Sequence, residues 1–178
     1  MHQAQEELLV LAAQTGNTKA FTYLCRHYQQ AVTRFAYKLS SDPQIVHDAV
    51  QNAWLKLAKN LHKLHDPRAF KSWLFKSVRW SVYDLMRAAK RDKENIANDI
   101  DVIDIVASVK PESLDIGSLI EQLPEIDKQV IHLFYLEEMQ LTQITEVLDL
   151  PLGTIKSRLY RARKALKKSV EESEDEYR

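Results

Sequence analysis

Apolar side chains recur along this chain at steps of three and four residues, the spacing that places them on one face of an α-helix. The longest such pattern predicts a helix from Lys19 to Leu39. Similar patterns predict a short helix over residues 6–14, a long one over 43–60 and another over 70–87. Four amphipathic helices predict a compact first domain. The core-facing residues of the longest helix are Phe21, Leu24, Tyr28, Val32, Phe35 and Leu39.

Local signals mark where one of these helices begins and where the first domain ends. In the segment SSDP, Asp42 suits an N-cap and Pro43 suits the first helical position. The helical pattern then fades over about residues 88–117, where charged residues, Asn, Ser and Pro are mixed. Apolar residues between 100 and 106 nevertheless predict that part of this linker packs against protein.

The remaining part of the chain has the pattern of a helix-turn-helix. After a helix opened by Pro124 and a break at residues 138–140, a short amphipathic helix over 142–148 leads into the turn DLPLG. We expect Thr154 to be the N-cap of the last helix. The residues of that helix spaced to face the core are Ile155, Leu159, Ala162 and Leu166.

Together these patterns predict an all-α chain of two helical domains joined by a partly ordered linker. The low glycine count, three in 178 residues, agrees with a helical protein. We expect the acidic C-terminal end to be disordered, because it offers little apolar surface to bury. The expected parts are a four-helix domain over 1–90, a linker over 91–117, a helix-turn-helix domain over 118–170 and an acidic tail over 171–178.

Composition excludes several classes of protein. No stretch approaches the roughly 18 apolar residues of a membrane span, and the first twenty residues carry Glu6 and Glu7 and lack the apolar run of a secretory signal. We therefore expect a cytoplasmic protein that does not insert into a membrane. Cys25 is the only cysteine, which excludes an internal disulfide and disfavours a cysteine-based zinc site.

The formal net charge of zero conceals a strong asymmetry along the chain. Counting Lys and Arg against Asp and Glu gives +2 for residues 1–60, +6 for 61–93, −11 for 94–149, +7 for 150–168 and −4 for 169–178. Two basic blocks thus flank an acidic one. A neutral total is therefore compatible with local surfaces that bind nucleic acid.

The basic block over residues 150–168 coincides with the last helix of the helix-turn-helix. Its exposed side can enter a major groove, where Arg and Lys reach base acceptors and Ser or Tyr add further contacts. The alternative is a solvated basic helix in a small bundle, which the flanking turn and the absence of acidic residues make less favourable. The residues expected on the exposed side are Lys156, Ser157, Tyr160, Arg161 and Lys164.

The helix over residues 70–87 carries a second functional candidate, a stripe in which cations alternate with aromatic rings. Such a stripe suits single-stranded nucleic acid, because bases stack on rings while cations hold phosphates. The alternative is that the aromatic residues complete a core. We prefer that alternative for Trp73 and leave both open for Trp80 and Tyr83. The stripe consists of Lys76, Arg79, Trp80, Tyr83 and Arg87.

Four segments resemble, in order and spacing, an alternative bacterial sigma factor of the extracytoplasmic-function (ECF) type. They are AFTYLCRHYQQAVTRFAYKL, DPQIVHDAVQNAWLKL, FKSWLFKSVRWSVYDLMR and LIEQLPEIDKQVIHLFYLEEMQLTQITEVLDLPLGTIKSRLYRARKAL. The resemblance implies a promoter-melting domain called region 2 and a second domain, region 4, that recognises the upstream promoter element. The implied partners are core RNA polymerase, promoter DNA and an anti-sigma factor, which is often membrane-tethered.

The resemblance also implies a docking face for polymerase on the helix over residues 43–60. Asp48, Gln51, Asn52 and Leu55 fall on one side of that helix. Asn52 stands where the family usually has an acidic residue, so one charge is missing from this face. Without the resemblance the four residues would be interpreted as an ordinary exposed helix surface.

Two sets of DNA-binding residues follow from the resemblance, with some departures from the family pattern. The loop HKLHDPRAF corresponds to a base-capturing loop, Trp80 replaces a common Asn, and Phe134 replaces a frequent Arg. Asp149 stands in the turn where Gly is frequent and tolerates left-handed geometry. The residues implied at the downstream −10 element are His65, Arg68, Lys71, Lys76, Arg79, Trp80, Tyr83 and Arg87. Those implied at the upstream −35 element are Thr154, Lys156, Ser157, Arg158, Tyr160, Arg161 and Lys164.

The sequence predicts neither an enzyme nor a cofactor site. His62 and His65 lie near Asp66, but no third and fourth ligand for a metal are evident. No phosphate-binding glycine loop or catalytic constellation is visible. Two other functions remain open from the residues alone: an operator-binding transcription regulator, and an adaptor whose basic helix grips an acidic protein.

Overall fold

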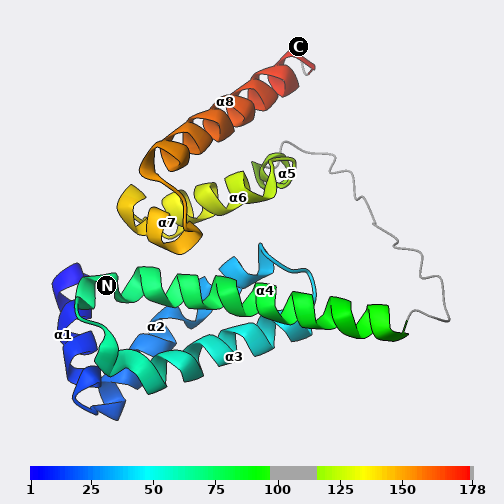
Figure 1. Cartoon of the computed structure of the whole chain (residues 1–178). Helices are drawn as coiled ribbons and strands as arrows, with labels where there is room; N and C mark the ends of the chain where they lie inside the picture. The colour runs from blue at the N-terminus through cyan, green and yellow to red at the C-terminus, as the bar shows by residue number, and fades with distance from the viewer. Residues whose placement is uncertain (97–115, 177–178) are drawn as a thin grey trace.

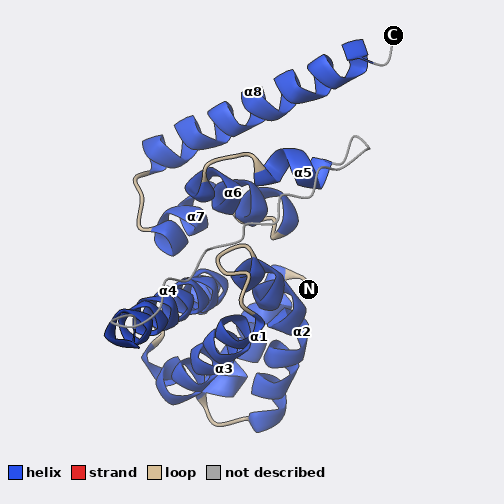
Figure 2. Ribbon diagram, turned by 90° about the vertical axis from the view of Figure 1, so that its right-hand side faces the viewer, coloured by secondary structure: helices blue, strands red, loops and turns tan. Residues whose placement is uncertain are grey.

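The computed structural model describes residues 1–96 and 116–176, and within them every regular element is a helix (Figures 1 and 2). The prediction of an all-α chain with two domains is confirmed. The first domain consists of α1 (Gln3–Gln14), α2 (Thr18–Tyr37), α3 (Pro43–Asn60), two short 3-10 turns (Leu61–Lys63 and Pro67–Ala69) and α4 (Phe70–Ile96). The second consists of α5 (Ile116–Glu121), α6 (Glu125–Ile131), a π-helical turn (His132–Leu136), α7 (Leu141–Leu148) and α8 (Leu152–Glu176).

Side-chain caps and a common apolar core define the first domain. The Asp42 carboxylate accepts from the backbone N–H of Gln44 at 2.9 Å, and Pro43 occupies the first turn of α3, as predicted. Gln14 at the end of α1 donates to the carbonyl of Leu64 at 2.6 Å, which ties α1 to the loop before α4. The largest side chains enclosed in this core are Leu24, Phe35, Leu57, Phe70, Leu74 and Phe75.

The helix-turn-helix forms as predicted, but its second helix starts earlier than expected. Asp149 ends α7 in the left-handed conformation, at a φ of 55°. The prediction that Thr154 is the N-cap is wrong, because α8 already begins at Leu152 and Thr154 lies inside its first turn. The carbonyl of Pro151 accepts the first helical hydrogen bond, from Ile155 N–H at 3.0 Å. Proline, which cannot donate, suits a position just before a helix.

The last helix of each domain, α4 in the first and α8 in the second, runs further than its apolar pattern indicates. Helix α4 continues to Ile96, past the domain boundary expected at residue 90. Helix α8 continues to Glu176, so the prediction of a disordered tail is wrong over residues 171–176. Lys, Arg, Glu and Ala are strong helix formers, and extending an existing helix needs no new nucleation. The linker predicted to pack against protein lies mainly in residues 97–115, outside the described residues.

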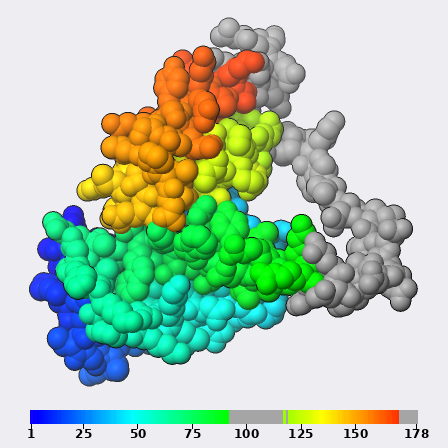
Figure 3. Space-filling view, viewed as in Figure 1, coloured from blue at the N-terminus to red at the C-terminus, as the bar shows by residue number. Residues whose placement is uncertain are grey.

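The two domains pack against each other. Figures 1 and 3 show the second domain lying against α4, and the most extensive contact between the domains is that of α4 with α7. Buried residues of both domains form one continuous apolar cluster. Phe35 of α2 meets the ring of His132 across this contact, with the ring centroids 5.5 Å apart. Helix α8 lies on the side of the second domain away from α4 in both ribbon views.

Candidate nucleic-acid interface

The outer face of α8 presents most of the residues predicted to contact duplex DNA. Lys156, Ser157, Arg161 and Lys164 are exposed, and Tyr160 keeps 67% of its surface open. Beneath them three apolar residues hold the helix on α6 and α7 and are buried: Ile155, Leu159 and Ala162. The predicted division between an inward and an outward side is confirmed. Duplex DNA can therefore approach this face without displacing any part of the described protein.

Two of the cations in the basic segment of α8 bind within the second domain instead. Arg158 is half-buried, and its Nη1 donates to the enclosed carboxylate of Asp127 on α6 at 2.8 Å. Arg163 donates to the hydroxyl of Tyr135 at 2.6 Å, and its guanidinium lies 5.2 Å from the centre of the Phe134 ring. Phe134, which departs from the family pattern, thus has a structural partner. The spacing already left both arginines out of the expected exposed side, whereas the family resemblance placed Arg158 in the −35 set.

The predicted stripe on α4 faces the second domain along part of its length. Lys76 forms an ion pair with Asp149 in the helix-turn-helix. Arg79 Nε donates to the Gln129 side chain at 3.0 Å, and the Gln129 amide in turn donates to the Tyr83 hydroxyl at 3.0 Å. The Arg79 guanidinium also lies 5.0 Å from the Tyr83 ring centre, in cation–π range. Both domains thus supply partners to this stripe.

Further along α4 the stripe lies open. Trp80 keeps 41% of its surface exposed, and Arg87 forms an ion pair with Asp84 on its own helix. Trp80 and Met86 line a surface hollow together with Arg79, Tyr83 and Arg87. Ser40 and Asp42 of the α2–α3 connection and Ile45 of α3 also line it. Trp73 packs against the core, as preferred from the sequence. Exposed aromatic and cationic groups meeting in one hollow are the combination that single-stranded nucleic acid uses.

The loop before α4 is shaped by one local ion pair. Asp66 caps the short turn that follows it by accepting from the backbone N–H of Arg68 at 3.0 Å. The Arg68 guanidinium also donates to this carboxylate from two nitrogens, Nε and Nη2, at 2.9 Å. These hydrogen bonds from Arg68 lower the pKa of Asp66. His65 lies next to this pair with an exposed side chain.

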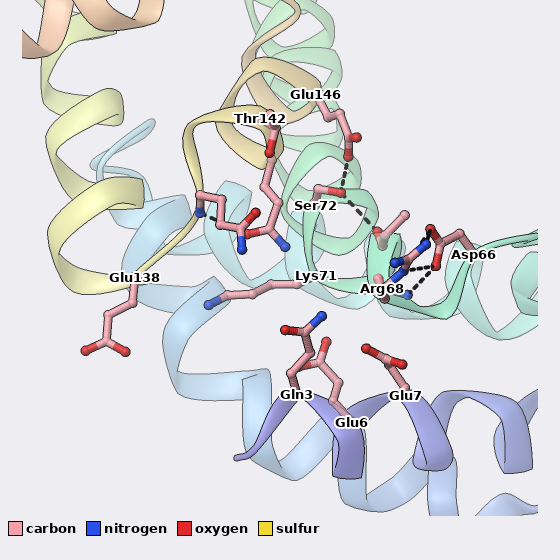
Figure 4. Close-up of a pocket in the computed structure, with 13 residues that line it drawn as sticks. Gln3, Glu6, Glu7, Asp66, Arg68, Lys71, Ser72, Glu138, Thr142 and Glu146 are labelled. Carbon is pink, nitrogen blue, oxygen red and sulfur yellow. Dashed lines mark hydrogen bonds and ion pairs between the residues drawn. The ribbon is translucent and has the colours of Figure 1, made fainter. Parts of the chain in front are cut away.

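Lys71, at the start of α4, reaches into the domain contact (Figure 4). Its ammonium group donates to the backbone carbonyl of Glu137. Burial lowers the pKa of Lys71, and the nearby carboxylates only partly offset that effect. Burial alone would raise the pKa of Glu137, but His132, whose Nε2 lies 3.3 Å from the Glu137 carboxylate, and the nearby cations Lys71 and Arg34 outweigh it, so the pKa of Glu137 lies below its ordinary value.

The predicted docking face on α3 is exposed and borders a hollow that the sequence did not indicate. Gln51, Asn52 and Leu55 are exposed, whereas Asp48 is half-buried and accepts from the Gln44 side chain at 2.9 Å. The hollow lies beside Gln51 and Leu55, and its wall continues onto α2. The additional residues that line it are Phe21, Gln29, His47, Val50, Trp54 and Ala58.

Two family models match this chain. The model described as Sigma-70 region 2 matches residues 24–92, and the model described as Sigma-70, region 4 matches residues 113–166. Together they cover more than half of the chain, and each falls on one of the two helical domains. The chain belongs to the sigma-70 family. As an alternative sigma factor, it directs promoter-specific transcription.

Curated relatives of this sigma factor match along nearly their whole length. It is 29% identical over 170 residues to the ECF RNA polymerase sigma factor SigW of Bacillus subtilis, covering 87% of this chain and 91% of the relative. It is also 29% identical over 189 residues to the ECF RNA polymerase sigma-E factor of Escherichia coli K12, covering 95% and 96%. The ECF type predicted from the sequence is confirmed by these relatives.

Solved structures share the fold of this sigma factor. A structure of CnrH in complex with the cytosolic domain of CnrY aligns with a TM-score of 0.66 at 24% identity, covering 94% of this chain and 97% of that one. The sigma factor RpoE of Bartonella quintana, in complex with the anti-sigma factor NepR, aligns with a TM-score of 0.67 at 22% identity, covering 86% and 98%. In the part of this sigma factor that the structure describes, no helix combines the length and apolar character of a membrane span.

Proposed function

We propose that this sigma factor binds core RNA polymerase through α3, places α8 on the −35 element and holds the opened strand of the −10 element on α4. The observation that carries this proposal is the presence of two separate basic faces, one of which also carries the exposed aromatic ring of Trp80. A duplex-reading protein needs only the face on α8. A chain that also keeps Trp80 exposed beside Arg79 is equipped for a strand whose bases are unstacked.

Helix α8 suits duplex recognition in the major groove. Lys156 and Arg161 are outward cations that reach base acceptors, and Ser157 and Tyr160 lie between them. We assign Arg158 a different task within the proposed −35 set, because its ion pair with Asp127 orients α8 on α6. The exposed Lys164 is placed for a phosphate contact, which positions the protein without specifying sequence.

Helix α4 and the loop before it suit a melted strand. Extruding a base costs a few kcal/mol, and stacking on an aromatic ring returns about 1–3 kcal/mol per base. Trp80 offers such a ring at the edge of its hollow, and Arg79 and Arg87 lie on the same wall for backbone phosphates. His65 is placed at the exposed surface of the preceding loop. Because Trp80 replaces a common Asn, we expect base preferences at the −10 element that differ from the family's.

The surface on α3 suits docking to polymerase. Leu55 exposes 53% of its surface beside the hollow that Trp54 also lines, so a partner that fills this hollow would bury apolar surface of both side chains. Gln51 and Asn52 supply polar contacts around it. With Asn52 in place of an acidic residue, we expect this docking to depend less on salt than in relatives that carry the charge.

We further propose an anti-sigma factor as a partner, because the similar structure from Bartonella quintana holds the sigma factor RpoE with the anti-sigma factor NepR. We place the protein in the cytoplasm, where core RNA polymerase acts, and assign it no catalytic step. The proposed functional parts are residues 1–90 for polymerase docking and −10 melting, 91–117 for the linker, 118–170 for −35 recognition and 171–178 for the acidic tail.

Reconstitution tests this function. Purified chain and bacterial core polymerase are incubated with a pool of genomic promoter fragments, and the transcripts are sequenced. We expect initiation from fixed start sites that share an upstream and a downstream motif. An operator-binding regulator would protect DNA without polymerase and start no transcript, and an adaptor would bind protein but no promoter. Either result contradicts the proposal.

A further inference from the structure

A tyrosine and an arginine of the second domain hold unused hydrogen-bond donors beside α8. Arg163 Nε donates to the Tyr135 hydroxyl at 2.6 Å. A guanidinium group can only donate, so the tyrosine oxygen is the acceptor and its own proton stays available. Within the part of the chain that the structure describes, the Tyr135 hydroxyl makes no second hydrogen bond and the Arg163 Nη atoms make none. Both side chains are exposed, so these donors can reach an anion in solution.

Two aromatic rings hold the guanidinium group of Arg163 in place. Its central carbon lies 5.2 Å from the centre of the Phe134 ring and 5.4 Å from that of the Tyr135 ring, in cation–π range. The two rings meet edge to face with their centres 5.0 Å apart, and Phe134 packs against the apolar core. A guanidinium group that is already oriented loses little conformational freedom when it binds a ligand.

The π-helical turn brings Tyr135 to this position. The backbone N–H of Glu137 donates to the carbonyl of His132 at 3.2 Å, which closes a wider turn than that of an α-helix. Single π-helical turns are frequent at functional sites. Because this turn precedes both α7 and α8, a contact made by Tyr135 would be additional to those of the helix-turn-helix.

Arg163 lies along one edge of the exposed face of α8. It follows Lys156 by seven residues, which places the two within about 20° of each other around the helix axis, and it follows Tyr160 by three. Lys156 and Tyr160 are exposed, and residues 150–168 contain no Asp or Glu. A duplex that lies against the exposed face therefore has a backbone beside this edge, where no carboxylate of α8 repels it.

We propose that Tyr135 and Arg163 form a phosphate-binding site, in which the tyrosine hydroxyl and the guanidinium Nη atoms donate to one backbone phosphate of the duplex held on α8. The inference rests on the −35 role proposed above for α8 and adds a contact from outside the helix-turn-helix. A phosphodiester has the same structure at every base pair, so the site strengthens and orients binding without selecting sequence.

Tyr135→Phe and Arg163→Gln test the two halves of the site. The first keeps the ring and removes only the hydroxyl, and the second removes the charge. Tyr23→Phe and Arg26→Gln are the matched controls, because both residues are exposed on α2, in the other domain. Fluorescence anisotropy measures binding of each full-length chain to labelled duplexes over a series of salt concentrations, and circular dichroism checks that each variant folds. One duplex is a promoter fragment from which the holoenzyme initiates, and the other is an unrelated sequence of the same length.

The two variants should weaken duplex binding in different ways. Tyr135→Phe should weaken binding to both duplexes by the same factor, about 3- to 10-fold, with an unchanged dependence on salt because a neutral donor is lost. Arg163→Gln should weaken binding and lower the slope of log affinity against log salt concentration by about 0.9, the value for one phosphate contact. The double variant should lose less than the product of the two factors, because both groups hold one phosphate. Both controls should bind as the wild type does.

Wild-type affinity of Tyr135→Phe for both duplexes would overturn the inference, as would an unchanged salt slope for Arg163→Gln. A loss confined to the promoter fragment would also overturn it, because the contact would then depend on sequence. Initiation by reconstituted holoenzyme distinguishes this failure from failure of the proposed function. If wild-type holoenzyme initiates and Tyr135→Phe binds normally, the phosphate site alone is refuted. If no promoter supports initiation, the proposed function fails, and binding to the unrelated duplex still decides whether the phosphate site exists.

Discussion

Arg158 and Arg161 lie one turn apart on α8, yet they have different surroundings. Arg158 donates to an enclosed carboxylate, that of Asp127, and Arg161 projects from the exposed face. The helical period predicted the exposed position of Arg161 correctly. It did not predict the partner of Arg158, because Asp127 is 31 residues away and on another helix. The sequence thus predicts which side of a helix a residue takes, but not which partner it meets.

Arg158→Ala and Arg161→Ala should therefore separate stability from recognition. Loss of Arg158 leaves the Asp127 carboxylate enclosed and unpaired, so we expect the free energy of unfolding to fall by about 1–3 kcal/mol in urea denaturation. Arg161→Ala should leave stability within about 0.5 kcal/mol and weaken −35 duplex binding by about 1–3 kcal/mol. Equal effects of the two variants on both quantities would contradict the assignment.

Glu137 should make the free energy of unfolding depend on pH. The pKa of Glu137 in the folded chain lies below the ordinary 4.5. The ionised carboxylate therefore contributes fully to the free energy of unfolding when the pH is above 4.5, and this contribution is lost as the pH falls through the lowered pKa. At pH 7, Glu137→Gln should reduce the free energy of unfolding by about 1–2 kcal/mol. Between pH 5 and 3 the variant should lose less stability than the wild type. Glu138→Gln, at an exposed neighbouring position, should keep the wild-type pH profile.

At the scale of single helices, the apolar period locates elements well and their ends less well. The predicted start of α3 at Pro43 is confirmed, because a proline and an N-cap aspartate fix it locally. Helix α8 begins at Leu152, before the expected cap at Thr154, because the carbonyl of Pro151 already accepts the first helical hydrogen bond. The end of α8 was missed because polar residues can extend a helix without an apolar face. The docking hollow beside α3 was also missed, because Phe21 lies on a different helix.

Leu55→Ala tests the role of α3 as a docking element. The side chain is exposed, so we expect little change in the free energy of unfolding but about 5- to 30-fold weaker binding to core polymerase, as for an interface anchor worth roughly 1–2 kcal/mol. Binding is measured by fluorescence titration of labelled chain with core enzyme. Leu8→Ala on α1 is the matched control, since Leu8 is a leucine with 68% of its surface exposed on a different face. Similar losses in both variants would refute a specific role for α3.

At the scale of the whole molecule, the domain contact could not have been predicted from periodicity. It depends on pairs such as Lys38 with Glu121, which are 83 residues apart in the chain. The basic and acidic segments that alternate along the chain indicated that segments of opposite charge could associate. They did not indicate which surfaces of the two domains would be in contact. The family resemblance predicted both domains, and the structure adds the contact between them, in which Lys76 and Arg79 of α4 meet Asp149 and Gln129 of the second domain.

The acidic end of the chain should limit indiscriminate DNA binding. Residues 169–178 carry a balance of −4 directly after a segment of +7, so they reduce the field around α8. Removing residues 171–178 should tighten binding to unrelated duplex DNA and steepen its dependence on salt concentration. The measurement is anisotropy titration over a series of salt concentrations. An unchanged affinity and slope would show that the tail has no such role.

Permanganate footprinting of promoter complexes tests most directly the division of labour between α4 and α8. Holoenzymes carrying wild-type, Trp80→Ala or Arg161→Ala chains are bound to one promoter, and reactive thymines report the opened strand. We predict that Trp80→Ala still protects the −35 element but lowers thymine reactivity about 5-fold or more, whereas Arg161→Ala reduces promoter occupancy itself. Wild-type thymine reactivity with Trp80→Ala at equal occupancy would contradict the account.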